Sequence, residues 1–359
     1  MDTSAAKAVP NVRVVEDGDF VAVLHKQPDG AERALAAVKA RYDTPDSDLN
    51  ERSIFDYLLE APSQRRVVSK RGDVKTGESK AFEVVESTYL DGYVAHAPIE
   101  PHAAVARVDG EKVTVWASTQ TPFGVRDQVA DLLNVGKAQV RVITPFVGGG
   151  FGGKSPSRQA LEAARLARLT GAPVQVAWTR EEEFFFDTFR PAAVVKVRSG
   201  IGERKRIAFW DYQVYFAGSR GSDHFYDIPH YATVSVGSER GGARVHPFGT
   251  GAWRAPANNT NTFARESHIE AMASVAGADA LEYRLEHLRN ERMRGALVVA
   301  AEKCGWSQKK PGKGRGRGIA CGTDVGTDVA TIAEVEVDRD SGEVVVRRVV
   351  CAQDMGLVI

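Results

Sequence analysis

The hydrophobic pattern of the chain changes twice, near residue 43 and near Phe82. Before residue 43 it predicts two short strands, at 12–15 and 20–23, and a helix at 31–41. Residues 43–79 are mostly polar around one central apolar group, and we expect a linker that holds a single short helix. From Phe82 onward apolar runs are frequent. The pattern therefore predicts three regions, with boundaries at 1–43, 44–81 and 82–359.

The third region combines short β-favouring runs, separated by turn residues, with stretches of helical periodicity. Strand-like runs dominate residues 192–248, so the strict strand–helix alternation of a parallel sheet is missing. The predicted fold class is therefore α+β, with mixed, mainly antiparallel sheets and packed helices. The expected strands are 82–85, 112–116, 140–147, 174–178, 194–197, 207–216, 233–236, 244–245, 330–337 and 343–350; the expected helices are 125–133, 157–169, 262–276, 280–288 and 293–304; 309–318 is expected to be a basic, glycine-rich loop.

A glycine-rich turn, GGGFGGK at 148–154, joins the strand at 140–147 to the helix at 157–169. We expect Ser155 or Ser157 to cap this helix and Gly171 to end it. Glycines let the backbone approach a ligand closely, and a helix N-terminus presents unpaired N–H groups to an anion. The turn is therefore interpreted as a cradle for an anionic cofactor.

Two other interpretations fit the same turn. Residues 148–155 match G-x-x-x-x-G-K-[ST], the phosphate-binding loop of nucleotide triphosphatases. The strand-rich stretch that follows does not continue as such a domain requires. Alternatively, the glycines only form a tight corner between strand and helix.

Several polar residues elsewhere are candidates for a site. His96 and Glu100 either form a polar site pair or satisfy buried backbone groups. Arg254, flanked by Trp253 and a nearby proline, is either a surface residue or placed for bidentate contact with an oxyanion. Thr179 is expected to cap the acidic run at 181–183, which is expected to be a solvated helix start.

Composition limits the classes of function. The formal net charge is zero, which gives no indication of a nucleic-acid or membrane-surface partner. No basic, apolar leader and no run long enough to span a bilayer is present in the sequence, so we expect a soluble protein. The three cysteines, at 304, 321 and 351, are far apart and are expected to be buried, without a disulfide framework or an iron–sulfur cluster.

Four features occur in this order and spacing in one known family: the stretch 93–101, the triplet Ser-Thr-Gln at 118–120, the glycine turn, and the WRAP loop at 253–256 ahead of 263–267. The sequence resembles the large, molybdenum-cofactor-binding subunit of the xanthine dehydrogenase and aldehyde oxidase family, especially bacterial isoquinoline 1-oxidoreductase β subunits. The resemblance implies that 82–359 is the first half of the molybdenum-cofactor-binding domain and that 1–43 is the remnant of an α/β hammerhead-like domain. It also implies that the glycine turn packs against a molybdenum centre.

The resemblance implies roles for individual residues. Gln120 would hydrogen-bond a ligand oxygen on molybdenum and Arg254 would lie beside the centre, so these two are the expected catalytic residues. Ser155 and Pro256 would line the substrate pocket; purine-oxidising members carry a glutamate where Ser155 stands, so purine is not the expected substrate. No residue is expected to ligate the metal directly. The expected cofactor-binding residues are Gln120, Gly149, Gly150, Phe151, Gly152, Gly153 and Arg254.

The implied reaction is the hydroxylation of an aldehyde or N-heterocycle with oxygen drawn from water. The implied cofactor is molybdopterin with molybdenum, either plain or in the cytosine dinucleotide form. The implied partners are an iron–sulfur electron-transfer subunit and the C-terminal half of the large subunit, which would also carry the general base, since Glu100, Glu266 and Glu270 match family positions other than the base. We therefore expect the chain to be inactive alone.

We expect a cytoplasmic location, or a periplasmic one if an export signal precedes the sequence. Two alternatives to the hydroxylase interpretation stay open: a non-catalytic cofactor-binding or assembly module, and a P-loop nucleotidase.

Overall fold

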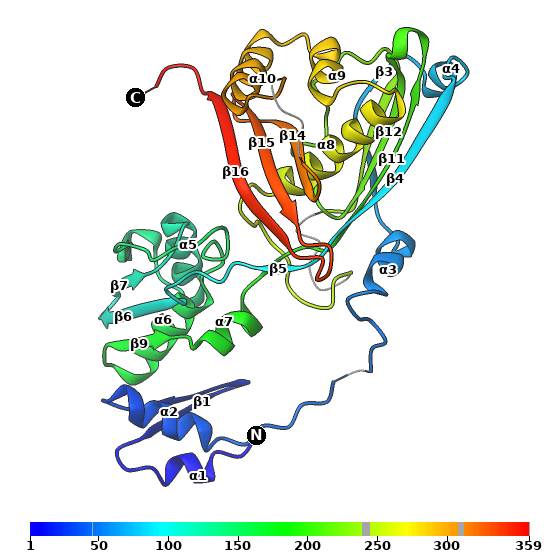
Figure 1. The fold of residues 1–359 in the computed structure, drawn as a ribbon. Coiled ribbons are helices and arrows are strands. Elements are labelled where there is room, and N and C mark those ends of the chain that lie inside the picture. Colours follow the sequence, from blue (N-terminus) through cyan, green and yellow to red (C-terminus); the bar gives the residue numbers. More distant parts are fainter. Residues whose placement is uncertain (45, 239–244, 308–311, 359) are drawn as a thin grey trace. The chain divides into compact units, whose positions relative to one another are not determined.

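The computed structural model describes residues 1–44, 46–238, 245–307 and 312–358 (Figure 1). The chain forms two compact units that alternate along the sequence. Unit 1 contains residues 1–49, 97–150 and 154–185, and unit 2 contains residues 50–96, 151–153 and 186–359. The glycine turn therefore contributes to both units, because residues 151–153 belong to unit 2 and the residues on either side belong to unit 1.

Unit 1 contains a four-stranded sheet covered by helices. Its elements are β6 (Ala103–Asp109), β7 (Lys112–Ala117), α5 (Pro122–Leu133), η1 (Lys137–Gln139), β8 (Val140–Ile143), α6 (Arg158–Thr170), β9 (Val174–Ala177) and α7 (Arg180–Phe186). The strand order is β8-β7-β6-β9, with β8 parallel to β7 and the other pairs antiparallel. Helices α5 and α6 pack on the sheet. Burial of their apolar faces, including Val129 and Ala163, stabilises this unit.

The N-terminal residues of unit 1 add a hairpin and two helices: α1 (Ser4–Lys7), β1 (Arg13–Asp17), β2 (Phe20–Leu24) and α2 (Pro28–Ala36). Val15 and Phe20 pack against the core of unit 1. Nε of Arg165, on α6, donates to Oδ2 of Asp17 over 2.8 Å. The two strands predicted before residue 43 are thus present, and the predicted helix is present at Pro28–Ala36 instead of 31–41. The assignment of these elements to a hammerhead-like domain stays a prediction.

Unit 2 is built on a five-stranded sheet in the order β3-β13-β12-β11-β4. The elements of this part are α3 (Ile54–Glu60), β3 (Arg65–Arg71), α4 (Val74–Glu78), β4 (Glu83–Asp91), β11 (Ala193–Ile201), η2 (Glu203–Lys205), β12 (Ile207–Tyr215) and β13 (Tyr231–Val236). β12 and β13 are parallel and every other pair is antiparallel. A separate two-stranded ladder joins β5 (Val94–Ala95) to β10 (Phe189–Arg190).

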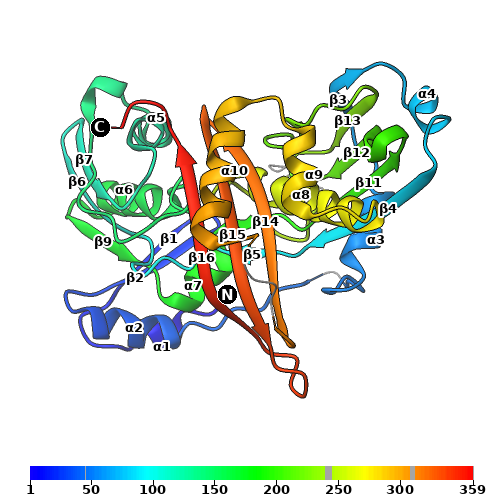
Figure 2. The ribbon, with the colours of Figure 1, turned by 45° about the horizontal axis from the view of Figure 1, so that its top comes forward.

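The rest of unit 2 contains three helices and a second sheet: α8 (Asn258–Val275), α9 (Ala280–His287), α10 (Glu291–Cys304), β14 (Arg315–Asp324), β15 (Thr327–Val337) and β16 (Val344–Asp354). The three strands form an antiparallel meander in chain order. Helix α10 lies along β15 and β16 (Figure 2). Helix α8 contacts β4 and β11 of the first sheet and β14 of the second, so it joins the two sheets into one core.

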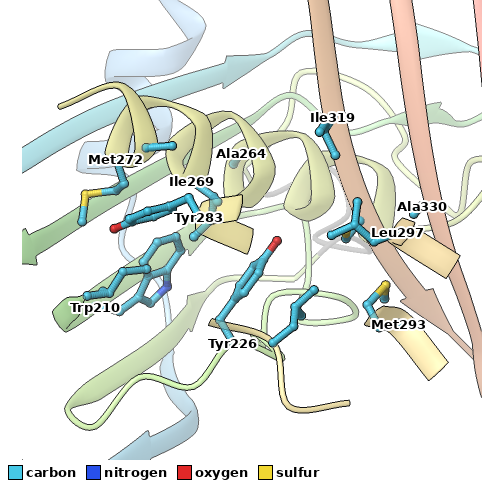
Figure 3. Packing of buried hydrophobic residues seen from close by; sticks show 14 of the residues in the cluster. Trp210, Tyr226, Ala264, Ile269, Met272, Tyr283, Met293, Leu297, Ile319 and Ala330 are labelled. Atoms are coloured by element: carbon cyan, nitrogen blue, oxygen red, sulfur yellow. The ribbon is translucent and has the colours of Figure 1, made fainter. Parts of the chain in front are cut away.

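The core of unit 2 is centred on α8 (Figure 3). Ile269 and Met272 on this helix and Trp210 on β12 are fully buried in one cluster, and Leu297 on α10 belongs to the same cluster. Removing any of these side chains would leave a cavity that costs about 2–5 kcal/mol of folding free energy. The first and second sheets are therefore held together by side-chain packing around one helix.

The predicted fold class, α+β with mainly antiparallel sheets, is confirmed, but some expected elements are wrong. The single helix expected in 43–79 is α3, whereas β3 and α4 were not expected. The loop expected at 309–318 includes the start of β14 at Arg315, and residues 309–311 lie outside the described residues. Arg244 also lies outside them, and Val245 is in a turn rather than a strand. The boundaries 1–43, 44–81 and 82–359 stay predictions.

Two further findings concern composition. Cys304 and Cys321 are buried as expected. Cys351 is exposed, because side chains alternate along β16 and its neighbours Val350 and Ala352 are the ones that face the core. Within the part of the chain that the structure describes, no helix has the length and apolar character needed to cross a membrane.

Candidate cofactor site

The unit 1 part of the glycine turn packs on the triplet that ends in Gln120. The Gln120 amide donates to the Lys154 carbonyl oxygen over 2.9 Å. A Cβ atom added at Gly150 would lie 2.5 Å from Oε1 of Gln120, so only glycine allows this approach. The expected proximity of Gln120 to the turn is therefore present in unit 1.

The lysine of the turn is buried and paired, which excludes the phosphate-binding loop interpretation. The Lys154 side chain is 0% exposed and its Nζ atom lies 2.6 Å from Oε2 of Glu100. The same carboxylate oxygen accepts the Gly148 amide over 2.9 Å. Burial of Glu100 opposes its ionisation, but these two hydrogen bonds outweigh burial and lower its pKa. A lysine held in this way does not reach a triphosphate above the loop.

The unit 2 part of the turn is attached to the WRAP loop. The Arg254 amide donates to the Phe151 carbonyl oxygen over 2.8 Å, and the Arg254 guanidinium lies 5.9 Å from the centre of the Phe151 ring. Phe151, Ala255 and Ala257 all have positive φ values, near 54°, 55° and 61°. Each such residue costs about 1–3 kcal/mol and persists only where the surroundings enforce it, as at ligand-binding sites.

His96 is the buried polar residue beneath this part of the turn. Its Nδ1 atom lies 2.8 Å from Oδ2 of Asp187 and its Nε2 atom lies 2.8 Å from the carbonyl oxygen of Ala252. Burial alone lowers the pKa of His96, but the hydrogen bond and the charge of Asp187 outweigh it and raise the pKa. Of the two interpretations of His96 and Glu100, the satisfaction of backbone groups is present: His96 contacts the Ala252 carbonyl oxygen in unit 2, and Glu100 accepts a hydrogen bond from the Gly148 amide in unit 1. Their charged partners are Asp187 and Lys154, respectively.

The donor set of the turn suits an anionic cofactor. Within the described part of the chain, the amides of Gly149, Gly150 and Phe151 donate no hydrogen bond to another residue. Arg254 is exposed and forms no ion pair with any described carboxylate. The unpaired amides of Gly149 and Gly150 in unit 1 favour oxyanions such as the phosphate of molybdopterin, and so do the unpaired Phe151 amide and the unneutralised Arg254 guanidinium in unit 2. The residues present therefore fit that cofactor.

The two expected pocket residues are half-buried and fixed through their backbones. The carbonyl oxygen of Ser155 accepts the Thr121 hydroxyl over 2.8 Å, and the carbonyl oxygen of Pro256 accepts the Asn258 amide over 2.6 Å. Neither contact uses the side chain, so the contribution of Ser155 and Pro256 to a substrate pocket stays a prediction.

The capping predictions have mixed outcomes. Ser157 is the N-cap residue of α6, but its hydroxyl donates to Thr119 instead of accepting a helix amide. Gly171 ends α6 in a left-handed conformation, as predicted. Thr179 accepts the Glu182 amide and so caps α7 as predicted. Glu183 was expected to be solvated, but it is 1% exposed. Its carboxylate accepts hydrogen bonds from the His102 amide and from Nδ1 of the same residue.

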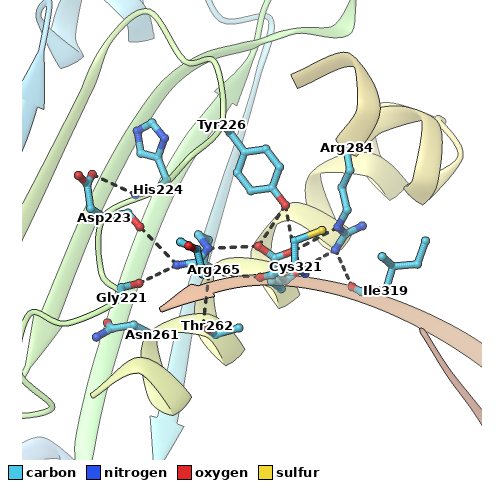
Figure 4. A network of polar contacts seen from close by, with 12 residues as sticks. Gly221, Asp223, His224, Tyr226, Asn261, Thr262, Arg265, Arg284, Ile319 and Cys321 are labelled. Atoms are coloured by element: carbon cyan, nitrogen blue, oxygen red, sulfur yellow. Dashed lines mark hydrogen bonds and ion pairs between the residues drawn. The ribbon is translucent and has the colours of Figure 1, made fainter. Parts of the chain in front are cut away.

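Glu266 is a structural counter-ion in the core of unit 2, where it binds Arg265 and Arg284, two residues labelled in Figure 4. Its carboxylate accepts hydrogen bonds from Nε of Arg265 and from Nε of Arg284, each over 3.2 Å, and a third from the Tyr226 hydroxyl. Arg284 in turn binds Glu270 over 2.9 Å. With every oxygen engaged, Glu266 has no capacity left for a catalytic proton transfer.

Asp187 and Ala252 were not recognised in the sequence as part of the site. Asp187 lies 91 residues from His96, and the contact of Ala252 uses only its carbonyl oxygen. The sequence offered one signal for Asp187, because it is an acidic residue just before β10. In the structure β10 pairs with β5, the strand that precedes His96.

Comparisons with known proteins show the family of this chain. The family described as "Molybdopterin cofactor-binding domain" matches residues 59–288. A nicotinate dehydrogenase subunit of Pseudomonas putida is 28% identical over the whole chain, which covers 33% of that protein. The beta subunit of isoquinoline 1-oxidoreductase from Brevundimonas diminuta is 29% identical over 74% of the chain, covering 36% of that protein.

The fold is shared with solved structures. Quinoline 2-oxidoreductase from Pseudomonas putida 86 superposes with a TM-score of 0.74 over 96% of this chain and 56% of that one, at 19% identity. The chain spans about a third of the length of the curated relatives just named. It belongs to the molybdopterin cofactor-binding domain family, within the large subunits of the molybdenum hydroxylases.

Proposed function

We propose that this chain is a segment of the catalytic subunit of a molybdenum hydroxylase and that it binds molybdopterin through Gln120, the glycine turn and Arg254. The observation that carries the proposal lies in unit 2, where the unpaired Phe151 amide accompanies the exposed Arg254 guanidinium, which has no described counter-ion. The unpaired amides of Gly149 and Gly150 in unit 1 add further donors. Family membership supports the identity of the anion.

The bound cofactor would supply the oxidation of an electron-poor carbon with oxygen taken from water. The residues of this chain would position and stabilise it. The turn amides donate hydrogen bonds to its acceptor atoms, and the Gln120 side chain, which lies beside Gly150, would contact it as well. Arg254, held over Phe151, stabilises negative charge that develops beside the turn. Glu266 is committed to Arg265 and Arg284, so the proposal places the general base elsewhere in the enzyme.

We propose an aldehyde or N-heterocycle as substrate, contacted by Ser155 and Pro256. The names of two relatives, a nicotinate dehydrogenase and an isoquinoline 1-oxidoreductase, support the heterocycle. The proposed partners are an iron–sulfur electron-transfer protein and the remainder of a large subunit, because the chain spans about a third of those relatives. The pterin is either plain molybdopterin or its cytosine dinucleotide.

The second candidate function is a cofactor-binding or assembly module without catalysis. It uses the same contacts and differs only in turnover. Reduction of a dye acceptor by an aldehyde or N-heterocycle, measured on the chain with its co-purified partners, separates the two functions. Turnover supports the hydroxylase, and molybdopterin binding without turnover supports the module.

The binding test uses the amide signals of the turn. The sequence contains three Phe-Gly steps, at 123–124, 151–152 and 248–249, so ¹³C-carbonyl Phe with ¹⁵N-Gly labels three signals. Anaerobic titration with molybdopterin is expected to shift the Gly152 signal. Arg254→Ala is expected to weaken binding by about tenfold or more, because a charge-assisted contact is lost. Arg339→Ala, on an exposed hairpin turn, is the matched control and is expected to bind as the wild type does. Unchanged signals in the wild type would reject the proposal.

A further inference from the structure

His96 and Asp187 form a buried pair outside the expected cofactor contacts. Both ring nitrogens of His96 face oxygen acceptors, the Asp187 carboxylate and the Ala252 carbonyl, each over 2.8 Å. A carbonyl oxygen and an ionised carboxylate only accept hydrogen bonds, so Nε2 carries a proton toward Ala252 and Nδ1 carries one toward the Asp187 carboxylate. The side chains of the pair are 0% and 6% exposed. The imidazolium is therefore enclosed by its two partners.

The glycine turn lies directly on this pair. A Cβ atom at Gly153 would come within 2.4 Å of Oδ2 of Asp187 and 2.8 Å of the His96 ring. A Cβ atom at Gly152 would come within 1.8 Å of the Ala252 carbonyl oxygen, the acceptor of His96. The glycines are thus required by close packing between the turn and the pair, and the position of the turn depends on where the pair holds Ala252.

The same contacts fix the loop that carries Arg254. His96 holds Ala252, the Trp253 indole donates to the Ala95 carbonyl oxygen over 3.2 Å, and the Arg254 amide donates to Phe151. Asp187 and His96 are each one or two residues from a strand of the β5–β10 ladder. The His96–Asp187 pair therefore connects this ladder to the Phe151–Gly153 part of the turn and to the WRAP loop.

We propose that His96 and Asp187 are positioning residues that clamp the Phe151–Gly152–Gly153 backbone to the Ala252–Arg254 loop and so set the placement of the Arg254 guanidinium. The effect of the pair on cofactor binding rests on the proposed function. The contacts that hold the turn to the Ala252–Arg254 loop lie within unit 2 and do not depend on it. The charged group that faces His96 within this packing is Asp187. Its removal leaves the buried imidazole without a counter-ion, and the loop loses the contact at Ala252.

The test follows the Arg254 amide. Trp253-Arg254 is the single Trp-Arg step in the sequence, so ¹³C-carbonyl Trp with ¹⁵N-Arg identifies this amide without further assignment. In Asp187→Asn and in His96→Gln we expect its hydrogen exchange to be at least tenfold faster than in the wild type. The matched control is Asp324→Asn, which breaks the Arg220–Asp324 pair elsewhere in unit 2 and is expected to leave the exchange unchanged.

Two variants keep the test decisive if one of them fails to fold, and Asp187→Glu, which retains the charge, is expected to restore part of the protection. Exchange at the wild-type rate in a folded Asp187→Asn or His96→Gln variant would overturn the clamp. The molybdopterin titration of Gly152 is then repeated on the variants, with a tenfold weaker affinity expected. If the wild type binds no molybdopterin, the proposed function fails while the exchange rates still decide the clamp. Wild-type affinity in variants with fast Arg254 exchange would overturn the clamp's role in cofactor binding.

Discussion

Lys154 and Glu100 form an ion pair in which Nζ lies 2.6 Å from Oε2, with the lysine fully buried and the carboxylate about one-third exposed. Oε2 of Glu100 also accepts a hydrogen bond from the Gly148 amide, so the pair connects the first residue of the glycine turn to the last. A lysine that the sequence pattern assigned to phosphate binding is therefore a structural element of unit 1.

Removing the carboxylate should destabilise unit 1. Glu100→Ala leaves Lys154 buried without a partner, and we expect a loss of about 2 kcal/mol or more, below the 3–5 kcal/mol of a fully buried pair because Glu100 is partly solvated. The free energy of unfolding in urea measures the effect. Asp127→Ala, which breaks the exposed pair with Lys137 in the same unit, is expected to cost less than about 1 kcal/mol. Equal losses in the two variants would contradict the structural role of Glu100.

Unit 1 should lose stability in acid through Glu183. Burial opposes the ionisation of this carboxylate, but the two hydrogen bonds from His102 prevail and lower its pKa. Because the pKa is lower in the folded state, the stabilisation is present above the unfolded-state pKa and is lost as the pH falls through the folded-state pKa. Thermal unfolding between pH 3 and pH 7 is expected to show a shallower acid slope in Glu183→Gln than in the wild type. The same slope in both would show that Glu183 is not the responsible group.

Gly152 should not tolerate a side chain. Its φ is +113° and the added Cβ atom would lie 1.8 Å from the Ala252 carbonyl oxygen, so Gly152→Ala displaces the turn or the loop. We expect loss of molybdopterin binding, which the Arg254 amide signal reports during the titration. Gly342→Ala is the control, since its φ is +75° with no atom within 4 Å, and its cost should be limited to about 1 kcal/mol of backbone strain. Normal binding by Gly152→Ala would show that the turn backbone is not a contact surface.

The sequence was sufficient where local chemistry decides the structure. Gly171 ends α6 and Thr179 caps α7 because each acts on residues close to it in the chain. β3 was missed because Arg65–Arg71 is a polar strand at the edge of a sheet, where half-burial leaves little hydrophobic pattern. β14 was missed because its glycines favour turns in isolation, and pairing with β15 overrides that preference.

The site was predicted less completely than the fold. The glycine turn and Arg254 stand out by composition, whereas Gln120 was expected only from the family resemblance. The contacts of Gln120 with the turn in unit 1 and of Arg254 with Phe151 in unit 2 are present. The charged partner of His96 could not be identified in the sequence, because Asp187 is brought to it by the fold from 91 residues away. Long-range ion pairs of this kind leave no periodic signal in one sequence.

The isolated chain should be unable to turn over substrate. It spans about a third of the length of its curated relatives, and Glu266, a buried carboxylate of unit 2, is engaged with two arginines. Loss of a general base typically lowers the rate about 10²–10⁴-fold. We expect purified residues 1–359 to contain substoichiometric molybdenum and to reduce no dye with aldehydes or N-heterocycles. Metal-replete, dye-reducing protein from these residues alone would require a base within them.

The most direct test of the central claim is the position of molybdenum in the enzyme that contains this chain. Diffraction data recorded on both sides of the molybdenum absorption edge locate the metal by its anomalous signal. We expect one molybdenum peak beside the backbone of Phe151 and Gly152, with the Arg254 guanidinium facing the same cofactor. A molybdenum peak remote from these residues, in a crystal where the turn and the loop are ordered, would contradict the proposed site.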